Sequence, residues 1–134
     1  VMNADILTDM NLRAMMQFHL EQDPLATLAV TTRESSRSFL FTPDGQLCGW
    51  RNQQTGKTRM SRDVHDIRPF SFSGIQIMKP QLLSLITREG AFSLVDVYLD
   101  LATSHRLLAY DHSDSLLLDV GSIEKAAIAE KFFP

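Results

Sequence analysis

Two aspartates, Asp5 and Asp119, are the residues of this chain whose type and position best suit chemistry. Each closes an apolar run and precedes a segment with helical character, one at either end of the sequence. In open α/β sheets, ligands gather where the chain leaves a strand for a helix. Two carboxylates there can hold Mg²⁺, which prefers oxygen ligands and phosphate partners. The pair therefore predicts phosphate chemistry, although either aspartate alone could serve as a helix cap or a turn residue.

Composition and charge restrict the class of protein. At 134 residues the chain suits one domain with a buried core, and its single cysteine, Cys48, excludes an internal disulfide. The net charge is −3, and the most basic stretch, residues 51–62, separates its Lys and Arg with neutral residues. We interpret that stretch as a solvated loop rather than a phosphate-binding patch and expect no nucleic-acid partner. No apolar run reaches membrane-spanning length, so we expect a cytoplasmic protein without a membrane partner.

Apolar patterning and turn residues predict strands that alternate with helices. The predicted strands cover residues 1–3, 25–31, 39–42, 46–50, 70–78, 106–110 and 116–119. One predicted helix begins near residues 9–11, and the others cover residues 80–86, 94–103 and 123–132. Asp44-Gly45 supplies the turn of a β-hairpin, and residues 51–68 are interpreted as a polar, mobile connection beside the site. The fold class predicted is α/β, a Rossmann-like mixed sheet flanked by helices with an inserted β-hairpin.

The histidines permit a competing hypothesis. His105 and His112, with Ser113 and Asp114, could suggest a hydrolase site. However, residues 111–115 are typical of a polar turn, and a catalytic triad requires a mutual geometry that spacing alone does not establish. The spacing of the histidines does not indicate a zinc site.

Three short motifs, in this order and spacing, resemble the sugar-phosphate nucleotidyltransferases, also called nucleoside-diphosphate-sugar pyrophosphorylases. Within that family, the sequence most resembles the bacterial N-acetylmuramate-1-phosphate uridylyltransferases and mannose-1-phosphate guanylyltransferases. Each motif is weak alone, and it is their succession along the whole chain that is specific. The motifs are Asn3-Ala4-Asp5-Ile6, Phe72-Ser73-Gly74-Ile75 and Asp119-Val120-Gly121-Ser122.

The resemblance implies an enzyme that joins a nucleoside triphosphate to a sugar 1-phosphate and releases pyrophosphate. It implies that Asp5 and Asp119 bind the catalytic Mg²⁺ and that Ser73 and Gly74 contact the sugar substrate. Asn3 either assists the first motif or bonds its own neighbouring backbone, as asparagine commonly does. Gly74 also stands inside a predicted strand, where a glycine can mark a bulge or the close approach of a ligand.

The sequence departs from the family in identifiable places. Ala4 replaces a usual glycine, and the family's Glu-Lys-Pro element has no counterpart in residues 51–57. The glycine-rich loop that binds the nucleoside triphosphate is also missing from this sequence.

We therefore expect residues 1–134 to be a single domain, the C-terminal metal- and sugar-binding portion of a longer catalytic domain. Alone, it should be inactive and should cover its open sheet edge as a homodimer. The alternative is a regulatory or assembly subunit that binds a sugar nucleotide without turnover.

Overall fold

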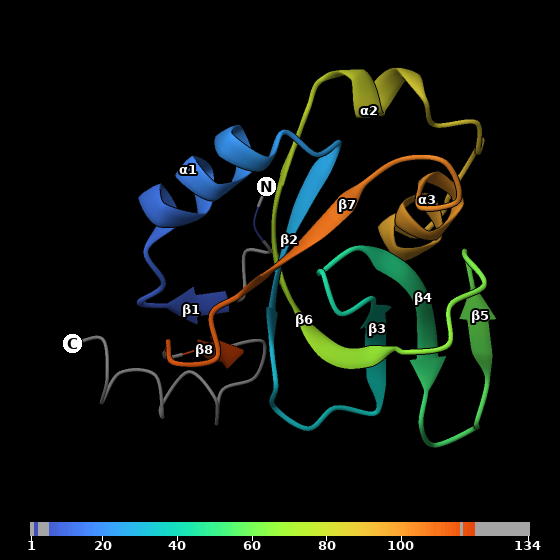
Figure 1. Cartoon of the computed structure of the whole chain (residues 1–134), viewed down its shortest axis with the longest axis horizontal. Helices are drawn as coiled ribbons and strands as arrows, with labels where there is room; N and C mark the ends of the chain where they lie inside the picture. Colours follow the sequence, from blue (N-terminus) through green and yellow to red (C-terminus); the bar gives the residue numbers. More distant parts are fainter. Residues whose placement is uncertain (1, 3–5, 116, 120–134) are drawn as a thin grey trace.

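A mixed sheet with helices on both faces forms the centre of the protein (Figure 1). The computed structural model describes residues 2, 6–115 and 117–119. Its larger sheet has six strands in the order β5-β4-β3-β6-β2-β7, with β2 parallel to β7 and the other neighbours antiparallel. These strands are β2 (Ala26–Thr31), β3 (Arg37–Phe41), β4 (Leu47–Asn52), β5 (Thr58–Met60), β6 (Arg68–Met78) and β7 (Leu107–Asp111). This architecture confirms the predicted α/β class.

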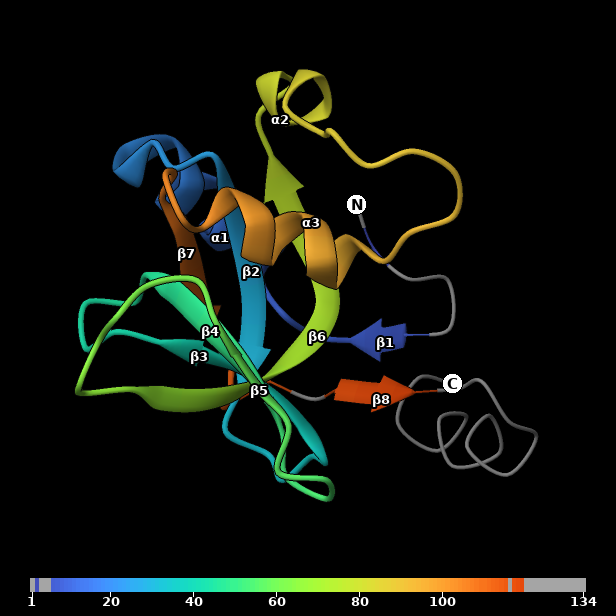
Figure 2. The same cartoon turned by 90° about the vertical axis from the view of Figure 1, so that its right-hand side faces the viewer.

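Two helices cover opposite faces of this sheet: in Figure 2, α3 lies in front of β2 and β6, and α1 lies behind them. On one face, α3 (Leu94–Leu101) buries Val97 and Tyr98 in the larger apolar core. On the other, α1 (Leu12–Gln22) buries Met15 against Ala29 and Ile75. Because successive residues of a strand point to opposite faces, β2 contributes to both cores in alternation. A short helix, α2 (Gln81–Ser84), follows β6.

A second, smaller sheet stands beside the first. It consists of β1 (Ile6–Thr8) and β8 (Leu117–Asp119), which run antiparallel with Ile6 opposite Asp119. In Figure 1 this pair lies to the left of β2 and β6, below α1. The chain thus brings a segment near its start next to a segment near its end.

Several boundaries agree with the sequence. Asn11 caps α1, because its side-chain oxygen accepts a hydrogen bond from the Ala14 N–H at 3.1 Å, and the helix ends before Pro24. The hairpin around Asp44-Gly45 forms as predicted, with β3 and β4 antiparallel. The predicted helix at 123–132 lies outside the described residues. No helix in the described part of the chain combines the length and apolar character needed to cross a membrane.

The prediction that residues 51–68 form a polar, mobile connection is wrong in its first half, where strands form. The strand β4 continues to Asn52, and β5 pairs with it from Gly49↔Met60 to Arg51↔Thr58. The polar composition of β5 concealed it, since an edge strand is often polar and short. The helix predicted from Pro80 to Ile86 is also shorter than expected, because α2 ends at Ser84.

Candidate functional site

The carboxyl ends of the two parallel strands, β2 and β7, define the candidate site. Their register runs from Ala26↔Leu107 to Val30↔Asp111, so both strands end at the same edge. A hydrogen bond joins the segments that follow these two strands, because the Thr32 N–H donates to Ser113 Oγ at 3.0 Å. This is the position at which α/β sheets commonly bind ligands.

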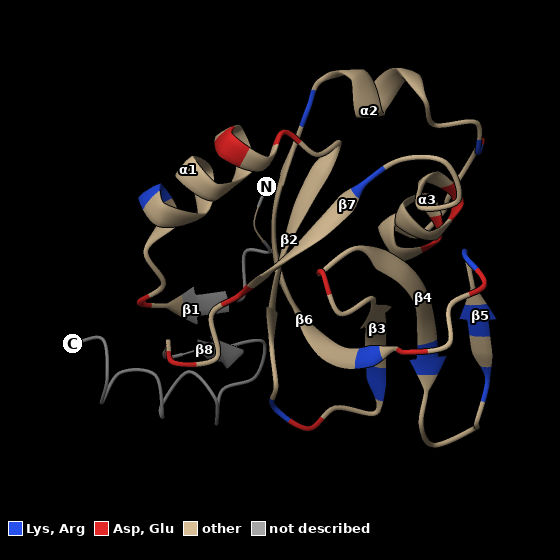
Figure 3. Ribbon diagram, viewed as in Figure 1, with Lys and Arg blue, Asp and Glu red and all other residues tan. Residues whose placement is uncertain are grey.

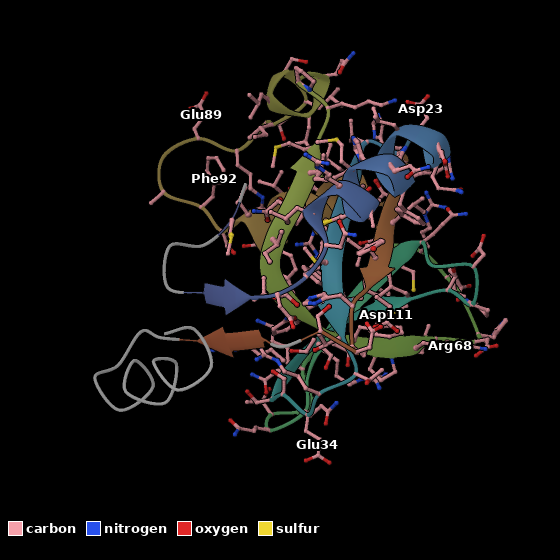
Figure 4. All side chains as sticks on the ribbon, turned by 90° about the vertical axis from the view of Figure 1, so that its left-hand side faces the viewer. Asp23, Glu34, Arg68, Glu89, Phe92 and Asp111 are labelled. Carbon is pink, nitrogen blue, oxygen red and sulfur yellow. The ribbon has the colours of Figure 1, made fainter. Side chains whose placement is uncertain are left out.

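A polar pocket of about 600 Å³ opens at this edge. Its volume is within the range of small-molecule sites. Hydroxyl and amide side chains dominate its wall, and Arg33 reaches across to donate from Nε to Ser71 Oγ at 3.3 Å. Glu34 lies at the tip of the loop after β2 and points outward, whereas Asp111 lies against the sheet (Figure 4). The lining residues are Thr32, Arg33, Glu34, Ser35, Ser36, Ser38, Gln53, Gln54, Pro69 and Ser71.

Gly74 forms part of an irregularity in β6 next to this pocket. Between the pairs Leu28↔Gln76 and Val30↔Phe72, β2 contributes only Ala29 while β6 contributes residues 73–75. Gly74 has φ +79°, a left-handed conformation that glycine adopts without strain. The glycine in the predicted strand therefore marks a shift of register, one of the two meanings expected for it.

Ser73, the residue before this glycine, is bonded to His112 rather than to the pocket. Its Oγ lies 2.6 Å from His112 Nε2, and both residues are buried. Burial lowers the pKa of the His112 imidazole, the nearby Arg33 lowers it further, and three neighbouring aspartates oppose the shift. The histidine is therefore neutral near pH 7, with one ring nitrogen as donor and the other as acceptor.

Two buried polar atoms at this edge have no hydrogen-bond partner among the described residues. They are His112 Nδ1 and Thr31 Oγ1. Buried polar atoms are nearly always paired in folded proteins, so each such atom requires an explanation. The site thus retains hydrogen-bonding capacity that the described part of the chain does not use.

The structure does not assemble the histidine-based hydrolase site. His105 and His112 lie before and after β7, at its two ends, and Ser113 bonds to Asp111 and Thr32. The Ser73–His112 pair resembles two members of a triad. However, Ser73 is fully buried, and within the described residues no carboxylate orients His112 through Nδ1.

Of the two predicted metal ligands, Asp5 and Asp119, the structure describes only the strand position of Asp119. Asp119 ends β8 opposite Ile6, whereas Asn3 and Asp5 are outside the described residues. The described neighbours of that segment are both paired: Met2 bridges to Ile75, next to Gly74, and Ile6 pairs with Asp119. Among the residues that can be described, no group of three or more His, Cys, Asp or Glu forms a metal site.

Sequence reasoning missed Ser71, which lines the pocket two residues before Ser73 on the same face of β6. It also missed Arg33, the only Lys or Arg among the described residues that line the pocket. The period-two alternation from Ser73 to Ser71 was a usable signal, but the position of Arg33 depends on how the loop after β2 folds.

A scan against protein-family models finds no match to this chain, and neither does a search of curated proteins. The resemblance to the nucleotidyltransferases therefore stays a prediction. The function has to be argued from the residues of the site themselves.

Proposed function

We propose that this chain is the metal- and sugar-binding portion of a sugar-phosphate nucleotidyltransferase. Such an enzyme joins a nucleoside triphosphate to a sugar 1-phosphate, giving a nucleoside-diphosphate sugar and pyrophosphate. One observation carries the proposal. The described residues on either side of the Asn3–Asp5 segment are paired with the two other motifs, Met2 with Ile75 and Ile6 with Asp119. Residues of the second and third motifs are thereby paired with residues that flank Asn3–Asp5 in sequence.

The chemistry of the donor set fits Mg²⁺. Asp119 occupies the strand position opposite Ile6, the residue that follows Asp5 in sequence. Mg²⁺ in phosphate-processing sites is typically held by one or two carboxylates, with substrate phosphates and water as the other ligands. Asp5 and Asp119 would hold it, and when bound it neutralises charge on the reacting phosphates.

The pocket wall supports a polyhydroxylated phosphate as the second substrate. Serine and threonine hydroxyls can donate and accept hydrogen bonds, and the Gln53 and Gln54 amides extend that capacity. Arg33 is the cation of the pocket, and its fork of N–H donors matches a phosphate group. Contact of Ser73 and Gly74 with the sugar is proposed from the resemblance alone, because Ser73 is buried and bonded to His112 in this structure.

The proposed reaction needs little general acid–base catalysis from the protein. A phosphate oxygen of the sugar 1-phosphate attacks the α-phosphorus in line, and the bond to pyrophosphate breaks. Catalysis then depends on holding the two anions in alignment and on neutralising their repulsion. We assign the alignment of the two anions and the neutralisation of their charge to Arg33, the pocket hydroxyls and the two aspartates.

We place the reaction in the cytoplasm, in keeping with the unpaired, buried thiol of Cys48.

The test is pyrophosphate release by the complete gene product with Mg²⁺, over a panel of nucleoside triphosphates and sugar 1-phosphates. We expect release that requires one specific pair of substrates and that stops when either is omitted. Omitting Mg²⁺ should abolish release as well. If the folded protein is silent across the panel, the transferase proposal fails, and a sugar-nucleotide-binding subunit without turnover becomes the account to test.

A further inference from the structure

A second groove lies between the β3–β4–β5 strands and the start of α3. It has a volume of about 420 Å³, large enough for a small organic ligand. We call it the Trp50 groove. Its lining residues are Arg37, Trp50, Asn52, Thr55, Lys57, Arg59, Ser93, Val95, Asp96 and Leu99. A smaller cavity of about 210 Å³ lies between this groove and the polar pocket and shares lining residues with both, among them Arg33 and Arg37.

Strand register explains why these side chains share one face. Arg37 pairs with Asn52, and the Asn52 N–H donates to the Lys57 carbonyl at 2.8 Å, so these three residues form one row across the strands. The next row is Phe39, Trp50 and Arg59. Since neighbouring strands are about 4.8 Å apart, the backbones of Arg37 and Lys57 are separated by roughly 10 Å, with Asn52 between them.

The cations of the groove differ in how they are used. Arg59 is engaged, with NH1 3.3 Å from Asp96 Oδ1 and NH2 2.5 Å from Asp100 Oδ1. Within the described chain, Arg37 and Lys57 have no carboxylate partner. Figure 3 shows that Lys and Arg residues collect on the lower ends of β3 and β4 and along β5, in a protein whose net charge is −3. This end of the sheet therefore favours anions.

The floor of the groove is apolar where its rim is cationic. Trp50, Val95 and Leu99 supply the floor, and Trp50 and Val95 also pack against the larger core. Ser93 caps α3 at the end of the groove, so the helix terminus that faces it carries partial positive charge. An apolar floor next to two available cations suits a ligand with a ring at one end and a phosphate at the other.

We propose that the Trp50 groove binds a nucleoside monophosphate, with its phosphate between Arg37 and Lys57 and its base and ribose over Trp50, Val95 and Leu99. None of the residues that line this groove also lines the polar pocket, and the site does not depend on the transferase proposal. Residues 51–62, interpreted from sequence as a solvated loop, thereby gain a binding role through Asn52, Lys57 and Arg59.

Trp50 is the only tryptophan of the chain, so its fluorescence reports directly on the groove. We would titrate the full-length protein with adenosine and uridine monophosphates and with inorganic phosphate. We expect a saturable change in Trp50 emission with at least one nucleotide, and binding at least about tenfold weaker for inorganic phosphate. Lys57→Gln and Arg37→Gln should each weaken nucleotide binding about tenfold, the effect of losing a charge-assisted hydrogen bond.

Two variants serve as controls. Arg51→Gln removes the same charge from the opposite face of β4, where Arg51 pairs with Ser38 and Thr58. Arg33→Gln removes the cation of the polar pocket. Both should bind as the wild type does. The proposal is overturned if no nucleotide saturates, if inorganic phosphate binds as tightly, or if Arg51→Gln weakens binding as much as Lys57→Gln. It is also overturned if Arg33→Gln weakens binding while Lys57→Gln does not, because the nucleotide would then occupy the polar pocket.

Discussion

The hydrogen bond between Ser73 and His112 is the contact that sequence could least have revealed. The two residues are 39 positions apart, and His112 stands in a run that is typical of a polar turn. It is buried nonetheless, because its backbone N–H continues the pairing of β7 by donating to the Val30 carbonyl at 2.9 Å. Motif reasoning identified Ser73, but its partner became visible only with the fold, in which β2 lies between β6 and β7 and His112, just after β7, still contacts Ser73 of β6.

Burial of His112 predicts a stability that falls in mild acid. Because the pKa of the folded-state imidazole lies below 6.5, the unfolded chain binds a proton at this site more readily than the folded chain. The contribution of neutral His112 to the free energy of unfolding is complete above pH 6.5 and is lost as the pH falls through the folded-state pKa. The measurement is the free energy of unfolding in urea at about pH 7.5 and about pH 5.5.

His112→Asn should reduce the difference between those two pH values. The difference should not vanish, since burial and then Lys79 also lower the pKa of His19, which acts with the same sign. His65→Asn, at an exposed position of the loop before β6, is the matched control. An undiminished difference in His112→Asn would show that this histidine does not link proton uptake to unfolding.

The helices and strands show which local signals suffice. Asn11 and Pro24 bracket α1, and Asp44-Gly45 makes the hairpin, because capping and turn formation depend on neighbouring residues. The strand β5 was missed because its three residues, Thr58, Arg59 and Met60, carry no apolar alternation. It forms because Gly49 on β4 leaves room for close approach, which is a property of the pair of strands and not of either sequence alone.

Gly49→Ala tests that explanation. A Cβ at this position would lie 2.7 Å from Met60 Sδ and 2.9 Å from the Arg59 carbonyl oxygen. We expect a loss of about 1–3 kcal/mol in the free energy of unfolding, as for other overpacked sites, measured by urea denaturation. Adding Met60→Ala should restore only part of it, since the clash with backbone remains. Wild-type stability in Gly49→Ala would mean that β4 and β5 do not pair as described.

On the scale of the molecule, the fold class followed from the succession of patterns, whereas the arrangement of charge did not. A net charge of −3 gave no indication of the cationic end of the sheet, because the cations come from three different strands. The linkage of the three motifs is likewise a long-range property, in which Ile6 pairs with Asp119 across almost the whole sequence. Sequence position suggested that the two aspartates act together, and this stays a prediction because Asp5 lies outside the described residues.

The most direct measurement is pyrophosphate release by Asp119→Asn in the complete gene product, with Mg²⁺ and the substrate pair that the panel identifies. The change removes a charge and keeps the shape of the side chain. We predict a fall in turnover of about 100-fold or more, as for other groups that stabilise charge in the transition state. Asp66→Asn, which removes an exposed carboxylate from the loop before β6, should retain wild-type turnover. Both variants should unfold in urea as the wild type does. Wild-type turnover in Asp119→Asn would contradict the account, because the carboxylate at the end of β8 would then have no part in the reaction.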